Sequence, residues 1–528
     1  MRFFNTAGIV KCSDHYCLPP LERFELDEIE NLIAQKKYFI LHAPRQTGKT
    51  TCMLALMEYL NNKKDYNCVY ANVEAAQGAR ENVFRGIRAI LNEISEQAAR
   101  QIHDDFMQDR WTDVLHKSGE DAGLRQLLTI WAEYSSKPTV LIIDEIDALI
   151  GDTLISVLRQ IRAGYSHRPE SFPQSIILCG IRDIRDYRIH SDRDKSIITG
   201  GSAFNIKAKS LRLGDFTHEE VKTLLQQHTE YSNQIFEHEA INMIWQLTMG
   251  QPWLVNALAY EVCFEIKEGR DRDKPITEEM IIQAKENLII RRETHLDQLA
   301  DKLREERVRK LILPFLNNTQ LEHGTTDDDI SYLVDLGLIR KDINGYEIAN
   351  PIYREIIPRQ LTTIFQANFE SSQRQAWYID QHGKLDMAKL ISAFQEFFRE
   401  HSEHWIERFD YREAGPQLLL QAFLQRVVNG GGRVEREYGL GRMRTDLLLI
   451  WPYEGGKQRV VIELKLLHKS LKKTMEDGSR QTASYLERCG TGDGHLIIFD
   501  RREAVSWDEK IFQKKIEYNN YVICVWGC

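Results

Sequence analysis

The sequence predicts a multidomain α/β protein with a parallel sheet in its first part and a second, strand-rich part at its end. Three observations support this. Short apolar runs alternate with helical stretches up to about residue 210, which is typical of a parallel sheet covered on both faces. Residues 211–300 are helical in pattern, and strand-like runs return from about residue 445. With 528 residues, the chain is long enough for about three or four domains.

The composition is that of a well-packed globular protein. Hydrophobic residues make up 42% and charged residues 28% of the chain. No apolar run approaches the roughly 20 residues that cross a bilayer, and the apolar stretch within residues 1–8 is too short for a signal-peptide core. We therefore expect a cytoplasmic protein.

The charge is unevenly distributed along the chain. The net charge is −9. Residues 401–528 carry 20 Lys and Arg against 18 Asp and Glu, whereas the preceding residues carry 49 against 60. The balance of the last part permits a nucleic-acid partner there without establishing one.

The nine cysteines form no Cys-x-x-Cys pair. Cys12 and Cys17 have no second pair downstream, whereas a zinc site would need four ligands at closer spacing. We expect all nine to be free, mostly buried thiols.

Strands and helices alternate in the first part. The predicted strands are 38–42, 68–73, 140–143 and 176–179, and the predicted helices are 49–61, 81–98 and 121–134. Residues 184–204 are rich in Arg, Asp, Ser and Gly, and we expect a mobile loop there. Thr217, with Glu220 three residues on, predicts the capped start of a helix in the next region.

A phosphate-binding loop follows the first predicted strand and opens the next helix. Its residues are Ala43, Pro44, Arg45, Gln46, Thr47, Gly48, Lys49, Thr50 and Thr51. Backbone N–H groups of such a loop and of the helix N-terminus cradle phosphates. We expect Lys49 to reach the β- and γ-phosphates and the Thr50 hydroxyl to ligate Mg²⁺. The usual first glycine is Ala43 here, which is still small enough for the turn.

A second motif expected of an ATP site lies at the end of the predicted strand 140–143. The apolar run 140–143 ends in Asp144 and Glu145. We expect Asp144 to hold Mg²⁺ through water and Glu145 to polarise the attacking water. Arg182, after the next strand, is a candidate γ-phosphate sensor or equally a surface ion-pair partner. Pro252 of Gly250-Gln-Pro252 is a candidate nucleotide contact, or only a helix break.

Residues 20–360 resemble the AAA+/STAND group of P-loop ATPases, particularly the archaeal-type ATPases. The resemblance is carried by the two motifs above, the helix start at Phe216-Thr217, Gly250-x-Pro252 and a winged-helix-like end at Gly345–Pro351. It implies a switch that binds and hydrolyses ATP with Mg²⁺, often coupled to an attached effector, and it permits a homo-oligomer.

Residues 305–360 have the order of a small winged helix, with short helices followed by a turn at Asn344-Gly345 between two strand-like runs. A DNA-reading helix needs basic residues. Asp327, Asp328, Asp329 and Asp335 crowd this one instead. Because acidic charge opposes contact with phosphates, a packing module is favoured over a DNA reader.

The last part contains a second group of candidate catalytic residues. Asp446 begins one strand, and Glu463 and Lys465 lie on the next, across a turn at 454–457. Residues i and i+2 of a strand share a face. Two carboxylates can therefore hold Mg²⁺ or Mn²⁺ against a phosphodiester, with a lysine beside them. The alternative is an ion pair on a surface strand, although the apolar neighbours of Glu463 indicate a central strand.

Residues 405–528 resemble the PD-(D/E)XK nuclease superfamily. Asp446, Glu463 and Lys465 match its metal motif, and Gln481 and Tyr485 match its Gln-x-x-x-Tyr element. The resemblance implies cleavage of DNA, or less readily RNA, with Asp446 and Glu463 as metal ligands and Gln481 in the site. The family also places an acidic residue on its first helix. Glu413 is the candidate, near Gln417 and Gln421, and Glu435 and Glu437 are alternatives.

We therefore expect five parts: a P-loop ATPase core (1–210), a helical lid (211–300), a winged helix (301–362), a helical connector (363–400) and a restriction-endonuclease-like α/β domain (401–528). The expected function is an ATP-hydrolysing switch that controls a metal-dependent DNA nuclease, of a kind found in prokaryotic defence or mobile elements. Two alternatives remain: an ATP-gated binding or signalling protein whose last domain is not catalytic, and a winged-helix DNA-binding regulator.

Overall fold

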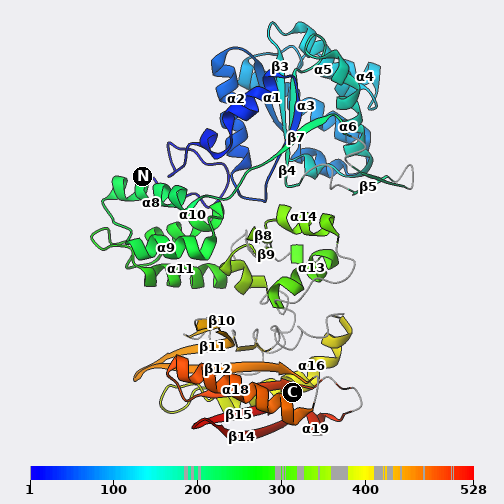
Figure 1. The fold of residues 1–528 in the computed structure, drawn as a ribbon. Coiled ribbons are helices and arrows are strands. Elements are labelled where there is room, and N and C mark those ends of the chain that lie inside the picture. Colours follow the sequence, from blue (N-terminus) through cyan, green and yellow to red (C-terminus); the bar gives the residue numbers. More distant parts are fainter. Residues whose placement is uncertain are drawn as a thin grey trace. The chain divides into compact units, whose positions relative to one another are not determined.

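The computed structural model describes residues 2–182, 188–191, 196–199, 204–291, 299, 302–303, 305–317, 326–342, 345–357, 378–408, 420, 423–424, 432–440, 443–467, 470–500, 502 and 505–528. The chain divides into two compact units, Met1–Arg354 and Glu355–Cys528 (Figure 1). Each unit is described by itself.

The first unit is built on a five-stranded parallel sheet in the order β2–β3–β4–β1–β7. The strands are β1 (Tyr38–His42), β2 (Asn67–Asn72), β3 (Thr139–Asp144), β4 (Ser175–Gly180) and β7 (Lys207–Arg212). The first four lie where the sequence predicts strands. The pattern missed β7 because it is an edge strand of mostly polar, half-exposed residues.

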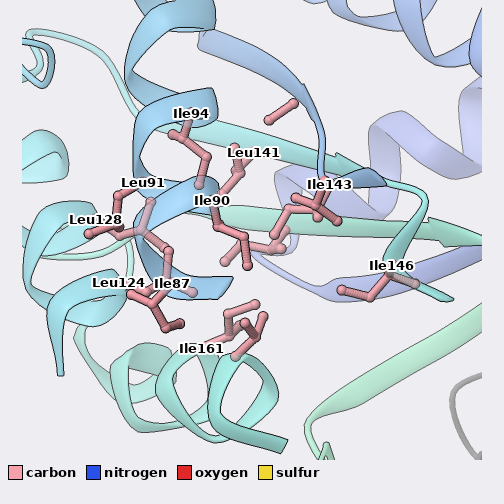
Figure 2. Close-up of a cluster of buried hydrophobic side chains, with 14 of the residues drawn as sticks. Ile87, Ile90, Leu91, Ile94, Leu124, Leu128, Leu141, Ile143, Ile146 and Ile161 are labelled. Atoms are coloured by element: carbon pink, nitrogen blue, oxygen red, sulfur yellow. The ribbon is translucent and has the colours of Figure 1, made fainter. Parts of the chain in front are cut away.

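Helices cover both faces of this sheet. They are α1 (Leu26–Ala34), α2 (Lys49–Lys63), α3 (Val83–Ile102), α4 (Trp111–Ser118), α5 (Gly123–Tyr134) and α6 (Gly151–Gly164), with 3-10 turns η2 (Glu74–Ala79), η3 (Ile146–Ala148) and η4 (Tyr165–His167). Side chains of β3 alternate between the two faces. Val140 and Ile142 pack in the cluster with α1 and α2. Leu141 and Ile143 pack in the cluster with α3, α5 and α6 (Figure 2).

The expectation of a loop at 184–204 is wrong for two segments. Arg188–Ser191 forms β5 and Ser196–Thr199 forms β6, and the two strands pair antiparallel. Residues 183–187, 192–195 and 200–203 lie outside the described residues.

The helical region follows β7. Its helices are α8 (His218–Ser232), α9 (His238–Thr248), α10 (Pro252–Tyr260), a π-helical turn η6 (Glu261–Glu265) and α11 (Glu278–Arg291). The capping box expected at the start of α8 is present. The Glu220 N–H donates to Thr217 Oγ1 at 3.2 Å, and the Thr217 N–H donates to a Glu220 carboxylate oxygen at 2.6 Å.

The end of the first unit has the expected order of helices and a hairpin. It consists of α13 (Glu306–Asn317), α14 (Asp327–Asp335), β8 (Ile339–Asp342) and β9 (Gly345–Ile348). Its assignment as a winged helix stays a prediction.

The N-terminal segment, which precedes η1 (Pro20–Arg23), contains a disulfide that the sequence did not predict. Cys12 and Cys17 are joined by a disulfide, so the expectation of nine free thiols is wrong for this pair. The other seven cysteines are free, and all of them except Cys524 are buried.

The second unit is a six-stranded mixed sheet in the order β10–β11–β12–β13–β15–β14. The strands are β10 (Arg433–Leu440), β11 (Met443–Tyr453), β12 (Gly456–Leu466), β13 (Gly494–Phe499), β14 (Phe512–Tyr518) and β15 (Tyr521–Gly527). The helices are α16 (Met387–Arg408), α18 (Leu471–Cys489) and α19 (Trp507–Lys510). Among the described residues, no helix has the length and apolar character that a membrane span requires.

Among the described elements of the second unit, α16 and α18 lie on opposite faces of its sheet. Phe394 of α16 packs in one cluster with Ile462 of β12, and Leu486 of α18 packs in another with Val461. The predicted division at residue 400 therefore falls within α16, which is part of the core of this unit and not only a connector.

The cluster under α3 should dominate the stability of the first unit. Ile90 is 1% exposed, and its removal in Ile90→Ala should cost about 2–5 kcal/mol, because a buried side chain is lost and a cavity remains. Phe84, on the same helix, is 47% exposed, and Phe84→Ala should cost less than about 0.5 kcal/mol. Urea unfolding of both variants tests this, and equal losses would contradict the described core.

Candidate functional site

The predicted phosphate-binding loop lies at the carboxyl end of β1. Its first residue extends the pairing with β4, since the Ala43 N–H donates to Gly180 O at 3.2 Å. Gly48 ends the loop with φ +90°, a conformation that favours glycine. A Cβ at this position would also lie 3.0 Å from Arg23 Nη1. The loop therefore requires glycine immediately before α2.

Lys49 directs its charge back into the loop. Lys49 is 6% exposed, and its ammonium donates to Ala43 O at 2.9 Å and Pro44 O at 3.0 Å. The Thr47 hydroxyl donates to the same Pro44 oxygen at 2.9 Å. A buried cation hydrogen-bonded to neutral backbone carbonyls is well placed to receive an anion.

Asp144 meets the start of α2. It follows Val140 and Ile142 on the face of β3 that α2 covers. Its Oδ2 accepts a hydrogen bond from Thr50 Oγ1 at 2.8 Å, and its side chain is fully buried. A hydroxyl and a carboxylate together offer the hard oxygen ligands that Mg²⁺ prefers, so this pair fits the expected metal.

Glu145 follows in a left-handed conformation, with φ +57°. A non-glycine residue in this region is strained and is a frequent feature of functional sites. Burial raises the pKa of the Glu145 carboxyl, and the negative charges of Asp147 and Asp144 raise it further, whereas Lys49 and Arg45 lower it. A carboxyl with a raised pKa next to a buried lysine is suited to accept a proton.

Arg182 lies near the end of β4, beyond Ile181, whose N–H donates to Asp147 Oδ1 at 3.0 Å. Its guanidinium lies 5.1 Å from the centre of the Tyr332 ring on α14. In this conformation Arg182 faces α14, and its role as a γ-phosphate sensor stays a prediction.

An open pocket adjoins the loop. It is lined by residues of the N-terminal segment, of the loop (including Gln46 and Thr47) and of α10, including Pro252. Two hydrogen bonds fix the N-terminal segment here: the Val10 N–H donates to Thr51 Oγ1 at 3.2 Å, and Trp253 Nε1 donates to Thr6 O at 2.7 Å. The structure thus brings Pro252 to the same pocket as the loop.

Arg23 and Tyr70 were not predicted. Arg23 donates to Thr47 O and to Gly214 O, the latter at 2.6 Å, and its guanidinium lies 4.6 Å from the centre of the Phe216 ring. No local pattern indicates these contacts. Tyr70 donates to Asp144 Oδ2 at 2.8 Å. The sequence could have indicated a role for Tyr70, because a tyrosine hydroxyl within an apolar strand needs a polar partner.

The candidate metal residues of the second unit lie on its central strands. Glu463 on β12 is 2% exposed, and Lys465 Nζ lies 2.6 Å from its Oε1. The register pairs Leu447 with Ile462, and Asp446 precedes the first of these while Glu463 follows the second. The backbone positions of Asp446 and Glu463 are therefore neighbours across the hairpin, while the side chain of Asp446 lies outside the described residues.

The predicted helix partners lie on α18, which covers the face of β12 to which Val461, Glu463 and Lys465 belong. Tyr485 is buried among the residues of that face, and Gln481, one turn earlier, is half-buried. The candidates for the first-helix acid cannot be placed. Glu413, Gln417 and Gln421 lie outside the described residues, as do the side chains of Glu435 and Glu437 on β10.

Within the described part of the chain, no group of three or more His, Cys, Asp or Glu side chains is arranged to hold a metal ion. Glu463 carries a buried carboxylate, a group that an oxygen-preferring cation can bind.

The model of a family described as the AAA-like domain matches residues 20–358. Among solved structures, a Walker-type ATPase of Pyrococcus abyssi is 14% identical over 67% of this chain and 99% of its own, with a TM-score of 0.46. The ORC2 protein of Aeropyrum pernix, in ADPNP–ADP complexes, is 15% identical over 65% and 93%, with a TM-score of 0.36. The CDC6 protein of Pyrobaculum aerophilum is 16% identical over 68% and 97%, also with a TM-score of 0.36. A search of curated proteins found no match.

The contacts of Arg23 predict that it supports the loop. Arg23→Met removes two hydrogen bonds from a charged donor, each worth about 1.5–3 kcal/mol. We expect ATP affinity to fall by roughly tenfold or more. Titration with a fluorescent nucleotide analogue measures this. Arg100→Met is the matched control, since Arg100 is exposed and forms an ion pair along α3 with Glu96. Equal affinities for the two variants would show that Arg23 has no part in shaping the loop.

Proposed function

The chain belongs to the family defined by the AAA-like domain, and from this premise we propose that it is an ATP-hydrolysing switch that controls a metal-dependent phosphodiesterase site in its second unit. The first half of the proposal rests on the geometry at Lys49, Thr50 and Asp144. The second half rests on the sequence motif around Glu463.

The contact between Thr50 and Asp144 is the observation that carries the ATPase proposal. It joins the first turn of the helix after the phosphate loop to a fully buried carboxylate of another strand. An isolated buried carboxylate would be costly. A paired hydroxyl and carboxylate beside a buried lysine have a direct use in holding a nucleotide phosphate and its Mg²⁺.

Each residue then has a distinct role. Backbone N–H groups of the loop and Lys49 bind the β- and γ-phosphates. Thr50 and Asp144 would hold Mg²⁺, which when bound neutralises phosphate charge. Glu145 orients a water molecule and accepts its proton as the water oxygen bonds to the γ-phosphorus and the bond to the β,γ-bridging oxygen breaks. The products are ADP and inorganic phosphate.

The raised pKa of Glu145 gives a pH-dependent prediction. The base works as the carboxylate, so turnover should fall as the pH drops through its pKa. Because that pKa is raised in the protein without nucleotide, the acidic limb of the kcat/KM profile should lie above the roughly 4.3 of an ordinary glutamate. Glu145→Gln should bind ATP and turn it over at least about 100-fold more slowly. Initial rates across pH measure both effects. Wild-type turnover by Glu145→Gln would remove Glu145 from the mechanism.

Support for the phosphodiesterase half comes from the second unit. Glu463 and Lys465 form a close pair on a central strand, and Glu463 is almost completely buried. A surface ion pair would have little reason to occupy this position. The adjacent backbone position of Asp446 is consistent with a second carboxylate ligand. Mg²⁺ or Mn²⁺ bound there would activate water toward a phosphodiester, and Gln481 is the candidate residue from α18.

Cleavage assays test this half with plasmid and single-stranded DNA in Mg²⁺ or Mn²⁺, with and without ATP. Glu463→Gln should abolish cleavage, since a metal ligand loses its charge, and Lys49→Ala should change the response to ATP. Glu487→Gln, an exposed change on α18, is the matched control and should cleave like wild type. ATP turnover without cleavage, and identical behaviour of Glu463→Gln and wild type, would favour the ATP-gated binding protein instead.

A further inference from the structure

We propose that Tyr70 is a positioning residue that fixes the Asp144 carboxylate and thereby sets the affinity of the nucleotide site for Mg²⁺. This inference rests on the proposed ATP site and adds a residue that no sequence motif contains. Tyr70 acts through Asp144, so it is a positioning residue and not a catalytic one.

The geometry places the Tyr70 hydroxyl on the metal-binding carboxylate. Tyr70 lies on β2, paired in register with Ile142 of β3, two residues before Asp144. Both side chains belong to the face covered by α2. The Tyr70 hydroxyl reaches Asp144 Oδ2 at 2.8 Å, the oxygen that Thr50 also contacts at 2.8 Å.

Tyr70 is the donor in this hydrogen bond, because a phenol O–H donates and a carboxylate oxygen accepts. Since Tyr70 is only 7% exposed, water has little access to replace that donor.

Tyr70 is itself held by a helix. Strand β2 is an edge of the sheet, so the Tyr70 backbone groups need partners outside it. Gln101 of α3 supplies both: the Tyr70 N–H donates to Gln101 Oε1 at 2.9 Å, and Gln101 Nε2 donates to Tyr70 O at 2.9 Å. The Gln101 amide thus makes the two backbone hydrogen bonds that a neighbouring strand would otherwise make with Tyr70.

The consequence concerns the state with metal bound. The Thr50 hydroxyl would then serve as a metal ligand, and the Asp144 carboxylate would keep its other donors. These include the Tyr70 hydroxyl, the Cys179 thiol and the Glu145 N–H, which donates to Oδ1 at 2.9 Å. Hydrogen-bond partners of metal-binding groups commonly change metal affinity or activity by 10–100-fold when removed. Tyr70 has the position of such a partner.

The test is the Mg²⁺ dependence of ADP binding, measured by calorimetry for wild type and Tyr70→Phe. We expect the Mg²⁺ concentration that half-saturates the effect on ADP affinity to rise about tenfold in the variant. ADP affinity in EDTA should stay at the wild-type value, because the Tyr70 hydroxyl hydrogen-bonds Asp144 and Thr50, which would hold the metal, whereas Lys49 and backbone N–H groups bind the phosphates. Tyr59→Phe is the matched control: its hydroxyl donates to Glu30 Oε1 at 3.0 Å, away from the site, and its Mg²⁺ dependence should match wild type.

Two results would overturn the inference. One is a wild-type Mg²⁺ dependence in Tyr70→Phe, and the other is an equal loss of ADP affinity with and without Mg²⁺, which would indicate only a structural role. If the wild-type protein hydrolyses ATP, the proposed function stands after either result. If wild type binds Mg²⁺ with ADP but hydrolyses no ATP, the proposed hydrolysis fails while a shifted dependence still supports Tyr70. A wild type that binds no ADP overturns both.

Discussion

The hydrogen bond between Thr50 and the buried Asp144 carboxylate is the contact on which the rest of the first unit depends. These residues are far apart in sequence, and in the sheet order β4 lies between β3, which carries Asp144, and β1, which precedes α2. Because alternate residues of β3 share a face, Asp144 points to the face that α2 covers. Gly48, at positive φ, ends the loop so that α2 begins with Lys49 and Thr50. Tyr70, Glu145 and Lys49 complete the same group through direct contacts or charge.

The sequence predicted the parts of this arrangement that are local. Apolar runs and the Gly-Lys-Thr turn located β1, β3, β4 and the start of α2, because buried strands and glycine turns leave strong local patterns. Strand β7 was not predicted, because a polar edge strand has no such apolar pattern. Arg23 and Tyr70 escaped because their roles arise from contacts between distant segments. The Cys12–Cys17 disulfide escaped because spacing alone does not determine pairing.

In the second unit the sequence predicted the strands that carry Asp446, Glu463 and Lys465 better than it predicted the domain boundary. The alternation of residues placed Glu463 and Lys465 on one face of β12, and their ion pair agrees with this. The predicted boundary missed that α16 packs against the sheet, because an amphipathic helix shows one apolar face without showing which core it covers. The first-helix acid depends on three-dimensional placement, and its candidates lie outside the described residues or their described side chains.

The most direct measurement is Mn²⁺ binding by electron paramagnetic resonance, with and without ADP, for wild type and Thr50→Val. Mn²⁺ takes oxygen ligands like those of Mg²⁺, and only a site formed with the nucleotide should respond to ADP. We predict that ADP adds one bound Mn²⁺ per chain in wild type and none in Thr50→Val, whatever the second unit binds. A wild type in which ADP adds no Mn²⁺, or a Thr50→Val variant that keeps the added ion, would contradict a metal–nucleotide site at Thr50 and Asp144.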